Sequence, residues 1–144
     1  MESDTSPVRI IDLPLITLGE WATAKVAIWE ESPETADAVK IRITCGDTVL
    51  EAESERGFFY ALRDIRIELS KRNAELKCCG ATENVYPSPM IAAMGYGEKA
   101  YRLTMGRQAL NADLVSIFDV DLEGRTVSTK EQDAYYQRWL ASLK

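Results

Sequence analysis

The adjacent residues Cys78 and Cys79 are the first that suggest chemistry in this sequence. A zinc site uses paired ligands such as C-x-x-C together with further Cys or His residues. Only Cys45 remains here, the chain has no histidine, and neighbouring side chains on a strand point to opposite faces. A cysteine or serine nucleophile would also lack its usual histidine base. We therefore predict reduced, largely buried thiols, no catalytic residue, no metal site and no cofactor, and leave a redox role for the cysteine pair open.

Three alternating carboxylates, those of Asp119, Asp121 and Glu123, could surround a hard cation. Their segment matches the beginning of a calcium-binding loop, but Lys130 stands at the twelfth position, where such a loop needs a bidentate Glu. The apolar residues between the acids are typical of a strand followed by a turn. We predict a solvated loop, and a small metal-assisted enzyme that uses these acids is the alternative.

The acidic residues are concentrated in the first third of the chain. Residues 1–55 contain 12 Asp and Glu against 4 Lys and Arg, whereas residues 56–144 contain 11 against 13. An acidic surface favours basic partners and repels nucleic acids and anionic membranes. The segment from Glu30 to Asp37 holds four of these acids with a proline and a serine, which predicts an exposed loop. We expect a protein partner, and neither nucleic acid nor membrane.

The aromatic residues offer a second candidate surface. Trp21 and Trp29 fall on one face of a predicted strand, beside the acidic segment, and interface centres are enriched in such residues. Whether a second layer covers this face stays open. Tyr86 lies in a connector with two prolines, where it either contacts a partner or fills the edge of the core. The predicted partner-binding residues are Trp21, Trp29, Glu30, Glu31, Glu34, Asp37 and Tyr86.

Length and composition are those of an ordinary globular protein. At 144 residues, 46% of them hydrophobic, the chain predicts one domain over residues 1–144 with a flexible tail over residues 1–7. No apolar run approaches the ~20 residues that cross a bilayer. The acidic beginning does not resemble a secretory signal, so we expect a cytoplasmic protein.

Alternating hydrophobic residues predict strands in the first half of the chain. Pro14 favours an edge position for the first of them, because proline cannot donate to a ladder. Gly46 and Asp47 predict a two-residue hairpin turn. The predicted strands are Val8–Leu18, Trp21–Trp29, Val39–Cys45, Thr48–Glu53, Glu75–Gly80 and Ala100–Met105, while Ala109–Phe118 fits either a short helix or a strand.

Two longer helices are predicted. Phe58, Leu62, Ile65 and Leu69 form an apolar stripe within Ser54–Asn73. The residues assigned to the polar side of this helix are Arg63, Arg66, Lys71 and Arg72.

The last helix begins near Thr129, where two overlapping capping boxes, Ser128 with Glu131 and Thr129 with Gln132, compete. Ser88, Pro89 and Gly95 predict a short helix with its cap and terminator, and Gly95-Tyr96-Gly97 a turn. The fold class is therefore α+β: an antiparallel sheet with one long packing helix and a C-terminal helix.

Sequence segments that together cover about half of the chain resemble those of a known family. The segments are F-F-Y-A-L-R-D-I-R-I-E-L, L-K-C-C-G-A, V-Y-P-S-P-M, K-A-Y-R-L-T-M-G, D-L-V-S-I-F-D and the ending Q-D-A-Y-Y-Q-R-W-L-A-S-L. Together they are similar to immunity proteins of bacterial toxin–immunity loci, such as those of contact-dependent growth inhibition. The resemblance implies a cytosolic protein that binds one toxin domain and blocks its active site, and it assigns no role to individual residues.

The function expected from the sequence is therefore non-enzymatic binding. We expect an immunity protein whose N-terminal carboxylates occlude a basic toxin domain around an aromatic anchor such as Trp29. The alternatives are the metal-assisted enzyme and a homo-oligomeric structural protein that buries the face of Trp21 and Trp29 against a second copy.

Overall fold

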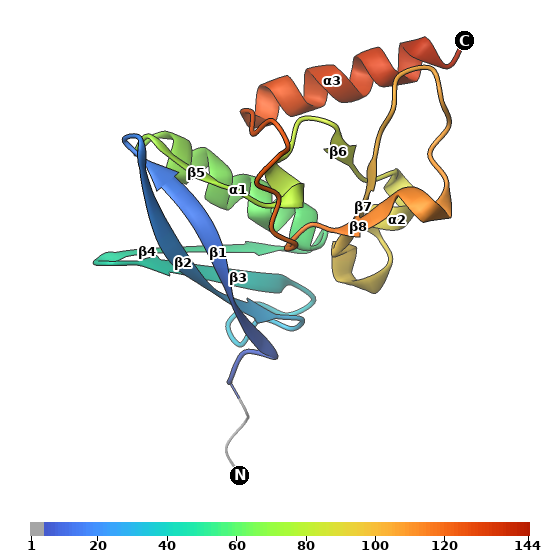
Figure 1. The fold of residues 1–144 in the computed structure, drawn as a ribbon. Helices are drawn as coiled ribbons and strands as arrows, with labels where there is room; N and C mark the ends of the chain where they lie inside the picture. The colour runs from blue at the N-terminus through green and yellow to red at the C-terminus, as the bar shows by residue number, and fades with distance from the viewer. Residues whose placement is uncertain (1–4) are drawn as a thin grey trace.

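The computed structural model describes residues 5–144, which form an α+β fold with two antiparallel sheets (Figure 1). Part of the predicted tail, residues 1–4, lies outside the described residues. The elements of the first half are β1 (Arg9–Thr17), β2 (Glu20–Trp29), β3 (Val39–Cys45), β4 (Thr48–Ser54), α1 (Phe58–Ser70) and β5 (Ala74–Leu76). Those of the second half are β6 (Val85–Tyr86), α2 (Pro89–Ala92), β7 (Lys99–Arg102), β8 (Leu114–Ser116) and α3 (Thr129–Ser142).

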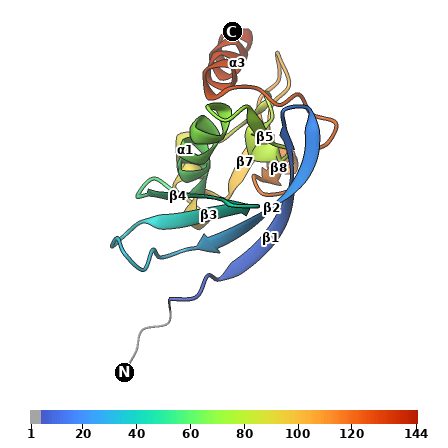
Figure 2. The same ribbon diagram turned by 90° about the vertical axis from the view of Figure 1, so that its left-hand side faces the viewer.

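The larger sheet has the strand order β4-β3-β2-β1-β5, and α1 packs across its inner face (Figure 2). The hairpin of β3 and β4 turns at Gly46 and Asp47 as predicted. Val26 pairs with Ile43 in register, and both are buried under the helix. The predicted stripe of α1 is buried in full, so the long packing helix is confirmed. Burial of these large aliphatic side chains, at ~25 cal/mol per Å² of apolar surface, is the main stabilising term of the fold.

The edge position predicted for the first strand is wrong. β1 lies between β2 and β5, because Leu15, Ile16 and Thr17 pair with the short strand β5. Pro14 is tolerated there because only its carbonyl is used on that side: it accepts a hydrogen bond from the backbone N–H of Lys77 at 2.9 Å.

After α1, several boundaries of the structural elements differ from those expected from the sequence. Asn73 adopts a positive φ of 57°, consistent with its predicted role in ending the helix. β5 ends at Leu76 rather than Gly80, and Cys79–Ala81 forms a 3-10 turn. Cys78 and Cys79 are buried free thiols, as expected, and Cys45 is half-buried. Burial raises the pKa of the Cys78 thiol to about 12, which keeps it protonated.

The second sheet, β6-β7-β8, carries the helix α2 and lies beside α3 (Figure 1). Ser88 caps α2 as predicted, but the helix ends at Ala92, before Gly95. The ambiguous stretch 109–118 contains a 3-10 turn followed by β8. Among the residues described, no helix has the length and apolar character needed to cross a membrane.

Buried polar contacts join the two halves. Arg66, which the sequence assigned to the polar side of α1, is 7% exposed, so that assignment is wrong. Its guanidinium donates to the carbonyls of Gly80 and Val127 and to the side-chain oxygen of Gln132, at 3.1, 2.6 and 2.7 Å. Gln132 is fully buried and in turn donates to three backbone carbonyls, including that of Val85. The acceptors offset the cost of burying these groups.

Candidate functional site

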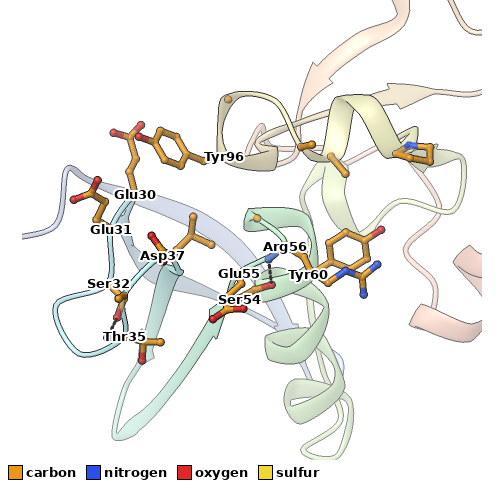
Figure 3. A pocket seen from close by; sticks show the side chains of 17 residues that line it. Glu30, Glu31, Ser32, Thr35, Asp37, Ser54, Glu55, Arg56, Tyr60 and Tyr96 are labelled. Carbon is orange, nitrogen blue, oxygen red and sulfur yellow. Dashed lines mark hydrogen bonds between the residues drawn. The ribbon is translucent and has the colours of Figure 1, made fainter.

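An open groove of about 1010 Å³ lies where three loops meet (Figure 3). One wall is the β2–β3 loop with Glu30, Glu31 and Asp37, and another is the β4–α1 turn, residues 54–57. The third is the chain from α2 to the 3-10 turn Gly95–Gly97. The groove residues are Glu30, Glu31, Ser32, Thr35, Ala36, Asp37, Val39, Ser54, Glu55, Arg56, Gly57, Tyr60, Pro89, Ala92, Ala93, Gly95 and Tyr96.

Two glycines bring the walls together. Gly57 has a φ of 105° and Gly97 a φ of 75°, conformations that glycine adopts without strain. A Cβ on Gly57 would lie 2.7 Å from the carbonyl oxygen of Tyr96, and a Cβ on Gly97 would lie 2.9 Å from that of Ala92. The two segments therefore meet backbone to backbone, which holds the five-stranded sheet against the 84–118 region beneath the groove.

The groove is rich in carboxylates that no cation within residues 5–144 pairs with. Glu30, Glu31, Asp37 and Glu55 are exposed, and none of them forms a hydrogen bond or ion pair with the residues from 5 to 144. Arg56 is the one cation among the groove residues, and its guanidinium lies 3.7 Å from the centre of the Tyr60 ring. Four negative charges against one positive charge produce a negative local potential, which attracts cations.

Glu34, a predicted member of this acidic surface, has a different role. Both of its carboxylate oxygens accept hydrogen bonds from Lys40 at 2.8 Å. These bonds hold the pKa of the Glu34 carboxyl below its usual value. Glu34 is not among the groove residues. Because Lys40 belongs to β3, these bonds anchor the β2–β3 loop to that strand.

The two tryptophans of β2 lie far apart and differ in exposure. Trp21 is 61% exposed, but Trp29 is only 4% exposed. The indole N–H of Trp29 donates to the carbonyl of Thr5 at 2.8 Å, and Lys40 and Arg42 lie 5.1 and 5.0 Å from its ring centre. They are eight positions apart along the strand, roughly 27 Å at ~3.4 Å per residue. The structure therefore does not bring them together as one aromatic patch.

Tyr86 is half-buried and packs against the core. Its hydroxyl donates to a carboxylate oxygen of Asp133 at 2.7 Å, and its ring stacks on Tyr136 with the ring centres 4.2 Å apart. Arg63 holds the same carboxylate through two bonds of 2.6 and 2.9 Å. Burial, together with the hydrogen bond to Asp133, raises the pKa of Tyr86 to about 12. Tyr86 thus fills the edge of the core, one of the two roles left open by the sequence.

The alternating acids after β8 do not converge. Asp121 accepts hydrogen bonds from the hydroxyl of Thr82 at 2.8 Å, from Arg102 at 3.3 Å and from the backbone N–H of Gly124 at 2.8 Å. These contacts stabilise the turn that follows. Over residues 5–144 no three His, Cys, Asp or Glu side chains are grouped in a way that could hold a metal ion.

Sequence reasoning missed the groove's tyrosines and one of its acids. Tyr96 is 47% exposed and has a φ of 60°, an uncommon conformation for a residue with a side chain. Tyr60 and Glu55 come from α1 and the turn before it. The one local signal was the placement of Tyr96 between two glycines, which predicts a tight turn with a projecting side chain.

The site is therefore an acidic groove with two tyrosines, formed by segments distant in sequence. Comparison of the chain with protein-family models and with curated proteins finds no match.

Proposed function

We propose that this protein is a non-enzymatic binding protein, an immunity protein of a bacterial toxin–immunity system of the contact-dependent growth inhibition type. It acts in the cytoplasm, where it binds a basic toxin domain and occludes the active site of that domain. The observation that carries the proposal is the groove whose carboxylates, those of Glu30, Glu31, Asp37 and Glu55, have no cation partner within the described chain.

Electrostatics explains why such a groove suits a cationic partner. Carboxylates that share one surface repel one another, and lysine or arginine side chains of a partner relieve that repulsion on binding. Complementary charge also accelerates association, which benefits an inhibitor that must capture a toxin before it acts. The predicted acids Glu30, Glu31 and Asp37 keep their proposed role, and the anchoring aromatic residue proposed for this groove is Tyr96 rather than the covered Trp29.

A second candidate function is self-association through the outer face of the larger sheet. Ile10 and Trp21 are each 61% exposed on neighbouring strands of that face, and exposed apolar surface favours an interface. Sedimentation velocity at micromolar concentration checks this function. A monomeric wild type would contradict self-association, and a dimer that dissociates in the Trp21→Ser variant would support it.

Growth protection tests the proposed function directly. The product of the neighbouring gene, the proposed toxin, is expressed in bacteria with the wild-type protein or with the variant E30Q/E31Q/E55Q. The control variant E20Q/D47N/E123Q removes the same number of charges from exposed positions outside the groove.

We expect the wild type and the control to protect growth and the groove variant to protect less, because only the groove variant loses carboxylates at the proposed contact. Equal protection by both variants would contradict the proposal that the groove is the contact surface. Absence of a complex between the wild type and the neighbouring gene's product would contradict the function itself.

A further inference from the structure

We infer that the groove takes an arginine side chain of the partner, with Tyr96 as the surface on which the guanidinium stacks and Glu30 as its carboxylate. This inference rests on the proposed function and names the chemistry that the partner must present. Two observations carry it: the groove that contains unpaired carboxylates also contains an exposed tyrosine ring, and its opposite wall contains an internal arginine–tyrosine stack.

The ring of Tyr96 is held in an accessible position. The residue lies between Gly95 and Gly97 in a turn with positive φ at all three residues, and its side chain is 47% exposed. Among residues 5–144, no cation lies over its ring and no other aromatic ring packs against it. Tyr96 and Glu30 line the same groove, and Figure 3 shows both side chains on the part of it away from Arg56 and Tyr60. The backbone therefore projects an apolar surface toward the charged part of the groove.

The carboxylate of Glu30, in the same groove as Tyr96, is available for a partner. Glu30 follows β2 directly, and its neighbour Glu31 begins the loop. Both are exposed and form no ion pair with the described residues. Guanidinium is the cation that matches this pair of features, because it is planar, stacks on aromatic faces and binds a carboxylate through two parallel N–H donors. The ammonium group of lysine is not planar and does not present two parallel N–H donors.

The opposite wall already contains such a stack. The guanidinium of Arg56 lies 3.7 Å from the centre of the Tyr60 ring. The guanidinium of Arg56 thus already covers the ring of Tyr60. Of the two tyrosines among the groove residues, Tyr96 is the one whose ring has no such cation over it. An arginine from the partner would reproduce on Tyr96 the contact that Arg56 makes on Tyr60, with the addition of the carboxylate that Arg56 lacks.

Short peptides distinguish arginine from lysine recognition. The probes are oligoarginine and oligolysine peptides of equal length and charge, titrated by calorimetry at low salt into the wild type, Y96N, Y96F and E30Q/E31Q. Asparagine tolerates a positive φ, so Y96N removes the ring with little backbone strain. Circular dichroism confirms that each variant is folded.

We expect the wild type to bind oligoarginine about two- to fivefold more tightly than oligolysine, the range that a cation–π contact at an exposed site provides. Y96N should abolish this preference by weakening oligoarginine alone, and Y96F should keep it. Equal affinity of the wild type for both peptides, or equal weakening of both by Y96N, would overturn the arginine inference.

The E30Q/E31Q variant separates the two proposals. If it weakens both peptides equally while the wild type shows no preference, the acidic groove stands and the arginine inference fails. If it weakens neither peptide, the groove is not the cation-binding surface, and the proposed function loses its site as well.

Discussion

At the scale of single residues, Arg66 shows how a charged side chain can hold a fold together from inside. Within residues 5–144 it has no carboxylate partner, and its three acceptors are the carbonyls of Gly80 and Val127 and the side-chain oxygen of Gln132. Burial lowers the pKa of Arg66 to about 10, so it stays charged at neutral pH. The positive charge is stabilised by oriented dipoles from three separate segments, which it ties to α1.

Replacing Arg66 with Met should destabilise the protein by roughly 2–4 kcal/mol. Methionine fills similar space but leaves buried acceptors unsatisfied, and each such group costs about 1–3 kcal/mol. Arg72→Met is the control, since Arg72 is exposed and its guanidinium forms no hydrogen bond or ion pair with the described residues. Urea unfolding measures both variants. A loss for Arg66→Met no larger than that of the control would show that the buried network contributes little.

The ion pair of Arg63 and Asp133 should make the free energy of unfolding depend on pH in the acid range. The hydrogen bonds from Arg63 hold the pKa of the Asp133 carboxyl below its usual value. A depressed folded-state pKa contributes stability that is present above the unfolded-state value and disappears as pH falls through the folded-state value. The stability difference between wild type and Asp133→Asn should therefore be full near neutral pH and shrink below pH ~4.

Urea midpoints measured from neutral to acid pH check this expectation. Asp64→Asn is the control, because Asp64 is exposed on the same helix as Arg63 and has no ion-pair partner in the described chain. A difference between wild type and Asp133→Asn that stays constant down to the lowest pH would refute the assigned role of the ionised carboxylate.

At the scale of elements, local sequence signals predicted what depends on local contacts. The hairpin of β3 and β4 follows from strict alternation on both sides of Gly46 and Asp47, and the inner face of α1 follows from its apolar spacing. The burial of Arg66 could not be predicted, because its acceptors lie 14 to 66 positions away in the sequence.

The same distinction applies to the groove. The composition of the segment from Glu30 to Asp37 predicted an exposed acidic loop, and the structure places that loop on one wall. The opposing walls come from residues 54–57 and 89–97, and their approach depends on glycine contacts between segments that no local pattern reveals. Tyr96 therefore escaped sequence analysis, and Trp29 was not recognised as covered by Thr5.

The start of α3 offers a test between the two capping boxes. Ser128 accepts a hydrogen bond from the backbone N–H of Glu131 at 3.1 Å, whereas Gln132 is occupied in the buried network. Ser128→Ala should cost about 1 kcal/mol of unfolding free energy, the usual value of an N-cap. Thr129→Ala should cost distinctly less in the same urea experiment. If the two costs were reversed, Thr129 would be the cap and the structure of this turn would be contradicted.

At the scale of the whole molecule, the contact between Gly57 and Gly97 joins the two sheets. Gly57→Ala should destabilise the protein more than Gly19→Ala, although both sites have positive φ. A Cβ has nothing within 4 Å at Gly19 but meets the carbonyl oxygen of Tyr96 at 2.7 Å at Gly57. Thermal unfolding of the two variants compares the costs. Equal shifts in melting temperature would mean that the junction relaxes and does not fix the walls of the groove.

The central claim for the molecule is that the groove's carboxylates bind a cationic protein. Calorimetry of the neighbouring gene's product, the proposed partner, titrated into wild type, E30Q/E31Q/E55Q and the matched E20Q/D47N/E123Q at low and high salt, tests it most directly. We predict that the groove variant binds roughly tenfold more weakly and with less salt dependence, since each exposed ion pair contributes about 0.2–1 kcal/mol, while the matched variant binds as the wild type does. Identical affinities and salt dependence for the two variants would contradict the account.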